Sequence, residues 1–246
     1  MTRSIRVFGT AACAAALFAI AAPASAQTET GPVSLSFDLG VQLAGPGDVH
    51  GAGTGTVLNL PTTVEARSYG DVFGNGFTWA AGMGYRLGAS GEFRLSGGYT
   101  KNVAERLQVG NVAGLPLFGL FGDYSAFSMD AGYRQYFGTS GMRPFIGGSV
   151  GFVRLSEAAA EFTVPAANVT LSNVDFFDTS TVPAFGVGAG VQVDLNARTA
   201  FQAGIDFKWH GAYKDLDGLA GTGLERINDE TSRWAMPITA GLTVRF

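Results

Sequence analysis

The last fourteen residues, 233–246, alternate between apolar and small or polar side chains. The apolar series occupies the even positions from Trp234 to Phe246, and small or polar residues fill the odd positions. Successive side chains of a strand point to opposite faces, so a period of two predicts a β-strand with one apolar face. On a helix the same apolar residues would be scattered around the whole circumference.

Seven further segments show the same alternation. They cover residues 33–43, 77–87, 92–100, 124–137, 143–155, 181–195 and 199–210. The segment 143–155 is the least regular, because Phe145 and Val153 fall on its glycine-rich face. Tight Gly-, Ser- or Asn-containing turns alternate with long stretches that lack sustained periodicity. These long stretches are 44–76, 101–123, 156–180 and 211–232. The sequence therefore predicts eight antiparallel strands joined alternately by short turns and long loops.

The face opposite the apolar residues decides between two architectures, a soluble lipocalin-like barrel or sandwich and an outer-membrane barrel. That face is dominated by Gly, Ser, Ala and Thr with isolated charges. Small residues suit the crowded interior of an eight-stranded barrel, whereas a strand surface facing water would not need them. The pattern favours an all-β fold, an eight-stranded antiparallel up-and-down transmembrane β-barrel. Its first and eighth strands must pair, because a barrel in lipid cannot leave a free edge.

Composition and the N-terminus agree with export to a membrane. Charged residues make up 15 %, below the roughly 25 % of ordinary globular chains. Arg3 and Arg6 precede an apolar run and a small-x-small motif that ends at Ala26, so we expect a cleaved signal peptide over 1–26 and a barrel domain over 27–246. The only cysteine, Cys13, falls in that signal. The net charge of −4 without a basic run argues against nucleic-acid binding.

Loop asymmetry and aromatic residues predict the orientation. Membrane barrels have short periplasmic turns and long external loops, so both termini are expected in the periplasm. Trp79, Trp209 and Trp234 then lie at the external ends of their strands, and Phe246 lies at the periplasmic rim. We expect these four aromatics at the membrane interfaces. Pro237 lacks the N–H group of a doubly paired strand, and a bulge near the external end could accommodate it.

Three segments resemble the small OmpA/OmpX-type outer-membrane β-barrel proteins. They are Asp130-Ala-Gly-Tyr-Arg-Gln-Tyr-Phe137, Arg143-Pro-Phe-Ile-Gly-Gly-Ser-Val-Gly-Phe152 and Leu242-Thr-Val-Arg-Phe246. The resemblance implies a Gram-negative outer membrane, contact with its lipid and lipopolysaccharide, and recognition of the Phe246 strand by the barrel-assembly machinery. It specifies architecture rather than activity.

The inward charges are the first candidate for function. They are Asp38, Arg86, Arg94, Asp130, Arg134, Asp194, Asp206, Lys208 and Arg245. One interpretation is the selectivity filter of a small pore. The interpretation we favour is a network of ion pairs that fills the lumen, since eight strands leave little open bore.

Catalysis and the loops give weaker signals. An acyl-transfer site needs a base beside a nucleophile, but neither His50 nor His210 forms a His-x-Ser pair, and we expect His210 to be solvated at a strand end. We expect no catalytic residue, cofactor or metal. The apolar run 115–121 could insert into the outer leaflet, cover the barrel mouth, contact a partner or pack among the loops.

These patterns predict a non-enzymatic, porin-like integral outer-membrane protein of the cell envelope, with external loops that mediate interactions with an unknown surface partner. The first alternative is a narrow channel for small or apolar solutes. The second is an enzyme that modifies lipid A in the outer leaflet.

Overall fold

The computed structural model describes residues 31–138, 141–216, 218–228 and 232–246. The expected signal peptide, 1–26, lies outside these residues. Within the described ranges, no helix has the length and apolar character needed to cross a membrane.

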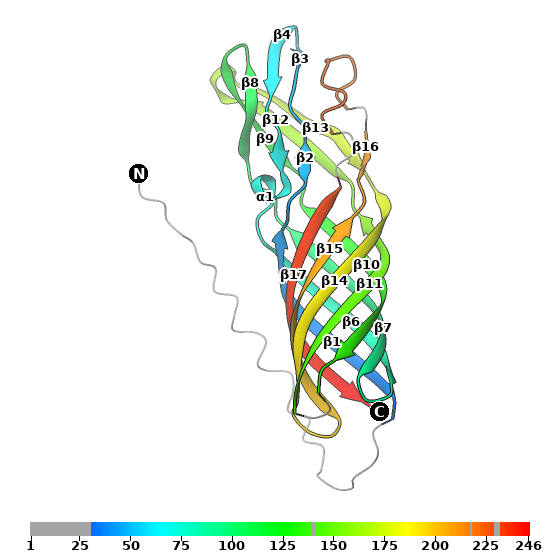
Figure 1. Cartoon of the computed structure of the whole chain (residues 1–246). Coiled ribbons are helices and arrows are strands. Elements are labelled where there is room, and N and C mark those ends of the chain that lie inside the picture. Colours follow the sequence, from blue (N-terminus) through cyan, green and yellow to red (C-terminus); the bar gives the residue numbers. More distant parts are fainter. Residues whose placement is uncertain (1–30, 139–140, 217, 229–231) are drawn as a thin grey trace, which may run out of the picture.

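Eight long antiparallel strands close into a barrel in the order β1-β17-β15-β14-β11-β10-β7-β6 (Figure 1). Their bounds are β1 (Val33–Ala44), β6 (Gly76–Leu87), β7 (Gly91–Asn102), β10 (Tyr124–Tyr136), β11 (Met142–Leu155), β14 (Ser180–Asp194), β15 (Thr199–His210) and β17 (Arg233–Arg245). The predicted strands are confirmed, with ends that differ by at most two residues. The first and last strands pair continuously from Ser34↔Arg245 to Ala44↔Ala235, which closes the barrel.

The alternation of each barrel strand sorts its side chains between two environments. Outward residues such as Phe37, Val187 and Ile238 are exposed, whereas inward Asp38 and Gln202 are buried. Phe145 and Val153, which made the phase of β11 irregular, are buried on the inward face. The exposed apolar belt surrounds a polar lumen, the arrangement of a barrel that meets hydrocarbon on its outside.

There is no bulge at Pro237 in the ladder between β15 and β17. β15 pairs with β17 from Thr199↔Val244 to Ile205↔Ile238 and again from Lys208↔Ala235, in the same register. Asp206 and Phe207 have no partner in this ladder, so rungs are missing but no residue is inserted. Proline cannot donate to the ladder, and the strand passes this point by omitting pairs on the β15 side while Pro237 pairs with Gln42 of β1.

The long connections also differ from expectation, because they contain a second sheet rather than irregular loops. We call it the loop sheet, and it rises from one end of the barrel, which we call the loop end (Figure 1). Its strand order is β16-β13-β12-β9-β8-β4-β3. The bounds are β3 (Gly53–Val57), β4 (Leu60–Val64), β8 (Leu107–Val112), β9 (Leu115–Phe121), β12 (Ala158–Val164), β13 (Val169–Asp178) and β16 (Lys214–Asp215).

Smaller elements connect the loop sheet to the barrel. They are β2 (Asp48–His50), which pairs with β5 (Arg67–Ser68), the short helix α1 (Tyr69–Val72) and the 3₁₀ turn η1 (Pro165–Ala167). The hydrophobic core of the described residues lies in the loop sheet, in these connecting elements and at the loop ends of the barrel strands. The buried rings of Phe121, Phe162, Phe176 and Phe177 pack edge-to-face or tilted, at centroid distances of 4.9–6.5 Å. The chain thus builds a polar lumen in the barrel and an apolar core beyond it.

Candidate functional site: the closed lumen

We call the end of the barrel that carries the short turns the turn end. Two groups of buried charges lie inside it. In the first, Glu92 accepts hydrogen bonds from the Ser34 hydroxyl at 2.7 Å and the Tyr136 hydroxyl at 2.6 Å. In the second, Asp194 binds both Arg143, at 3.1 Å, and Arg245. These residues come from several different strands, so their bonds tie the barrel wall together across its interior.

A second layer crosses the middle of the lumen. Asp38 lies 3.6 Å from the guanidinium of Arg94 and accepts a hydrogen bond from the Gln202 amide. The Gln202 carbonyl in turn accepts from Arg94 at 3.3 Å and from Arg134 at 3.0 Å. The Arg134 guanidinium also lies 4.3 Å from the centre of the Phe145 ring. One carboxylate, one amide and two arginines therefore occupy the axis where a pore would run.

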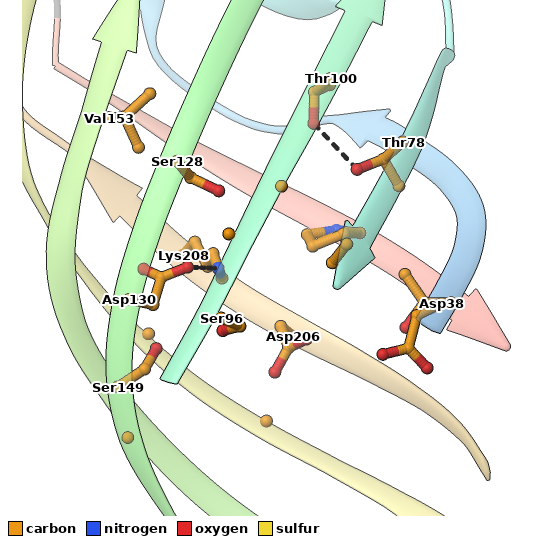
Figure 2. A pocket seen from close by; sticks show the side chains of 18 of the residues that line it. Asp38, Thr78, Ser96, Thr100, Ser128, Asp130, Ser149, Val153, Asp206 and Lys208 are labelled. Atoms are coloured by element: carbon orange, nitrogen blue, oxygen red, sulfur yellow. Dashed lines mark hydrogen bonds and ion pairs between the residues drawn. The ribbon is translucent and has the colours of Figure 1, made fainter. Parts of the chain in front are cut away.

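A cavity of about 130 Å³ lies between this layer and the loop end. Figure 2 shows Asp38, Asp130 and Asp206 around it, with Lys208 bonded to Asp130 at 2.6 Å. The lining of the cavity also includes serine and threonine hydroxyl groups, such as that of Thr78, and glycines of β7, β10, β11 and β14. The inward glycines leave this space because they contribute no side chain.

An aromatic layer closes the cavity at the loop end. The Arg233 guanidinium lies 3.5 Å from the ring centre of Tyr124 and 4.7 Å from that of Tyr69. Tyr213 stacks on Tyr69 at 6.5 Å and meets Tyr124 edge-on at 6.2 Å. Phe73 contacts both Tyr69 and Tyr124. Packed rings from separate segments of the chain therefore lie across the loop end of the cavity.

The structure places all nine sequence-predicted charges on the inward face. They divide between layers: Arg86, Asp194 and Arg245 are at the turn end, Asp38, Arg94 and Arg134 are in the middle, and Asp130, Asp206 and Lys208 line the cavity. No ion pair of Arg86 or Asp206 is found among the described residues. Their role as a pore lining or a packing network stays a prediction.

Sequence reasoning missed several lumen residues. Glu92, Arg143, Gln202 and Arg233 all have buried side chains that join or face these layers. Glu92 lies two positions from Arg94, and Arg233 lies on the odd face of the closing strand, so alternation alone could have found both.

The expectation that His210 is solvated is wrong. Its side chain is 6 % exposed, and its Nδ1 has no hydrogen-bond partner. The aromatic layer covers this strand end, which a sequence pattern limited to strands does not reveal. His50 is 1 % exposed, and burial lowers the pKa of its imidazole. It stacks on Phe121 at 5.6 Å in the loop-sheet core.

The apolar run 115–121 packs within the loop sheet. It forms β9, whose Leu117 and Phe121 are buried in the core, while Leu115 stays exposed at its tip. Trp209 and Trp234 face each other on neighbouring strands near the loop end, and Trp79 stacks on Phe37 on the outer wall. Phe246 follows β17 at the turn end and is exposed.

No group of three or more His, Cys, Asp or Glu side chains in the described ranges has a geometry that could hold a metal ion. Neither buried histidine has a Ser, Thr or Cys hydroxyl or thiol as a hydrogen-bond partner in the part of the chain that the structure describes. The lumen therefore offers charged groups for binding.

The chain is similar to several solved structures. Among solved structures, Neisserial surface protein A is 15 % identical, with a TM-score of 0.47, over 89 % of this chain and 100 % of that chain. OprG from Pseudomonas aeruginosa is 11 % identical, with a TM-score of 0.45, over 90 % and 99 %. The outer membrane protease OmpT from Escherichia coli is 7 % identical, with a TM-score of 0.46, over 89 % and 99 %. No curated protein sequence matches significantly.

Residues 12–246 match the family described as "Outer membrane protein beta-barrel domain". This match covers the barrel and the loop sheet together. The chain therefore belongs to the outer-membrane β-barrel family, and its place is the outer membrane.

Proposed function

We propose that this protein is a non-catalytic component of the cell envelope whose loop sheet mediates interactions at the cell surface, with both termini in the periplasm. The observation that carries the proposal is the tip of the loop sheet. Three neighbouring hairpin turns form it, and we call it the crest. Its residues are 58–61, 113–116 and 165–168, all exposed and none charged.

The three turns are adjacent in the sheet. The backbone N–H of Ala113 donates to the carbonyl of Pro61 at 2.8 Å, and β9 contacts η1. Leu58 is 63 % exposed in a left-handed conformation, with φ of 51°. An apolar side chain rarely occupies such a position, because both its exposure and its backbone conformation are unfavourable. Contiguous exposed apolar surface on an otherwise well-packed element is typical of an interaction site.

The closed lumen supports a structural role over a channel. An ion crossing the barrel would have to displace the turn-end charges, the Asp38–Arg94–Gln202 layer and the Tyr69–Arg233–Tyr124 stack in turn. A narrow channel is the second candidate function. Two observations favour it: strand pairs are missing beside Pro237, and the cavity lies next to this gap. We also propose that exposed Phe246 presents the closing strand to the barrel-assembly machinery, and that the exposed outer wall contacts membrane lipid and lipopolysaccharide.

Charge placed on the crest tests the surface role. We expect the double variant Leu58→Asp/Leu115→Asp to reduce adhesion of protein-displaying cells to host-cell monolayers and apolar surfaces several-fold. The matched control is Thr54→Asp/Thr63→Asp, which adds the same charge to exposed, directly paired positions on the body of the same sheet. Equal adhesion of the two variants would contradict the proposal.

Two further measurements address the alternatives. In planar bilayers we expect no reproducible openings; openings that are reduced by Asp130→Ala would establish a channel instead. Lipid A mass spectra after overexpression should be unchanged, and an altered acylation pattern would establish an enzyme.

A further inference from the structure

We propose that the loop end of the lumen cavity is a binding site for a small oxyanion, a carboxylate or a phosphate, held by Arg233. Arg233 begins β17, is 7 % exposed and lines the cavity together with His210 and Lys208. It forms no ion pair with any described residue. A buried guanidinium without a counter-ion is strongly unfavourable, so the cavity beside it should hold its partner.

The unpartnered atoms of Arg233 indicate the shape of that partner. Nε and Nη2 are both buried and lack a hydrogen-bond acceptor. These two nitrogens point in the same direction along one edge of the guanidinium. That edge is the fork that binds two oxygens of a carboxylate or a phosphate in parallel hydrogen bonds.

The aromatic rings do not replace such a ligand. Tyr124 and Tyr69 lie 3.5 and 4.7 Å from the guanidinium carbon, which places them over the charge in cation–π contacts. Tyr213 is nearly parallel to Tyr69, at 14°, and nearly perpendicular to Tyr124, at 88°, so Tyr69 and Tyr124 contact the guanidinium from two different directions. A ring face supplies no oxygen acceptor, and Nε and Nη2 still lack one.

Neighbouring groups favour an anion at this point. His210 pairs with Arg233 across the β15–β17 ladder, and its Nδ1 is buried without a hydrogen-bond partner. Lys208 lies two residues along the same face and neutralises Asp130 at 2.6 Å. The cavity therefore presents an unsatisfied arginine edge and an unsatisfied imidazole nitrogen on one wall, and the lysine beside them is already paired to its own carboxylate.

The lumen as a whole carries more positive than negative charge. Its inward carboxylates are Asp38, Glu92, Asp130, Asp194 and Asp206. Its inward cations are Arg86, Arg94, Arg134, Arg143, Lys208, Arg233 and Arg245. The complete chain is acidic, with a net charge of −4, so this excess is a local property of the lumen. An anion in the cavity would reduce it.

Size restricts the ligand. A cavity of about 130 Å³ accommodates phosphate or a carboxylate of a few carbon atoms, but no extended lipid or sugar. Free phosphate and a short carboxylate share the same pair of acceptor oxygens, and titration with each separates the two sources.

The test uses the full mature protein in nanodiscs. Its unfolding temperature is measured against phosphate, acetate and, at matched ionic strength, chloride. We expect a saturable increase with phosphate or acetate that exceeds the effect of chloride, because a ligand that binds only the folded state raises its stability. Arg233→Gln should weaken the apparent affinity at least tenfold. Lys101→Gln, which removes an exposed cation outside the lumen, should leave it unchanged.

Two outcomes would overturn the proposal: no saturable oxyanion effect on the wild-type protein, or the same effect in Arg233→Gln. Calorimetric titration of the wild type with phosphate and acetate measures binding even if Arg233→Gln does not fold, and Arg233→Lys keeps the charge without the fork. Asp229 and Glu230 lie outside the described residues. Tighter phosphate binding after Asp229→Asn/Glu230→Gln would show that the chain's own carboxylate fills the site, which also overturns the proposal.

Discussion

Phe176 holds the loop-sheet core together, and its removal should open the sheet while the barrel stays closed. The ring is 1 % exposed and contacts four others, His50, Phe121, Phe162 and Phe177, at 4.9–6.5 Å. Truncation of a buried phenylalanine to alanine costs about 3–5 kcal/mol. With ~1.4 kcal/mol per factor of ten, the opening equilibrium of the sheet should increase roughly a thousandfold.

Amide hydrogen exchange of Phe176→Ala in nanodiscs measures this directly. We expect much faster exchange in β9, β12 and β13, because local opening exposes their backbone hydrogen bonds. The barrel strands should keep wild-type exchange, since their side-chain bonds are in the lumen. Phe185→Ala is the matched control, because it removes the same ring from the exposed outer wall. Equal acceleration in both halves would refute two separable cores, and no acceleration anywhere would refute the packing.

Three further predictions concern pH, a buried ion pair and close packing. Burial lowers the pKa of His50 below 6.5, with Arg67 adding to this effect and Asp48 opposing it, so the unfolded loop sheet takes up the proton first. The full stability of the loop sheet should therefore be present above about pH 6.5 and decrease as the pH falls below that value. Faster amide hydrogen exchange in the loop sheet at about pH 5 should show this loss. The variant His50→Phe should abolish the pH dependence. The variant Asp130→Asn leaves the ammonium group of Lys208 without its carboxylate partner. It should lower the free energy of unfolding by about 3 kcal/mol in urea titrations. The double variant Asp130→Leu/Lys208→Met, which removes both charges, should recover most of this loss. Gly241→Ala should cost about 1–3 kcal/mol in the same titrations, because its Cβ would lie 2.0 Å from the Phe37 carbonyl oxygen, while Gly148→Ala, 3.7 Å from its nearest neighbour, should be tolerated.

The barrel could be predicted from the sequence because lipid and lumen impose opposite demands on alternate residues. Along β14, Phe185 and Val187 face outward between Gly186 and Gly188, and no soluble strand surface requires that contrast. Alternation also placed all nine predicted lumen charges on the inward face. It could not show which strands bring their charges together across the barrel, since that depends on register and tilt.

The loop sheet escaped prediction for a different reason. β3 alternates glycine with threonine, so it has no large apolar face, and β9 is almost continuously apolar, so it has no period. Both are strands because neighbouring segments supply their partners, as β4 does for β3 and β12 does for β9. Such pairing overrides a weak local signal.

The burial of His210 and Arg233 was not predicted for the same reason, because it depends on the long connections. Each lies at the loop end of its strand, and the sequence pattern predicted solvent for His210 there. Tyr69 comes from a connection between barrel strands and contacts Arg233, and Tyr213 stacks on Tyr69, so segments without a regular sequence pattern determine the environment of this strand end.

The pairing of β1 with β17 has a consequence for how the chain folds. β1 and β17 are the first and last strands that the structure describes, so the contact that closes the barrel has the largest sequence separation of any strand pair in it. Contacts of this kind form slowly, because the intervening chain loses conformational entropy before the contact contributes any stability. Loop-sheet strands instead pair with those of the next loop along the chain, and their ladders can grow in order. Folding should therefore pass through an intermediate in which the loop sheet is largely formed and β1 is not yet paired with β17. The rate at which the barrel closes should be most sensitive to substitutions in β1 and β17.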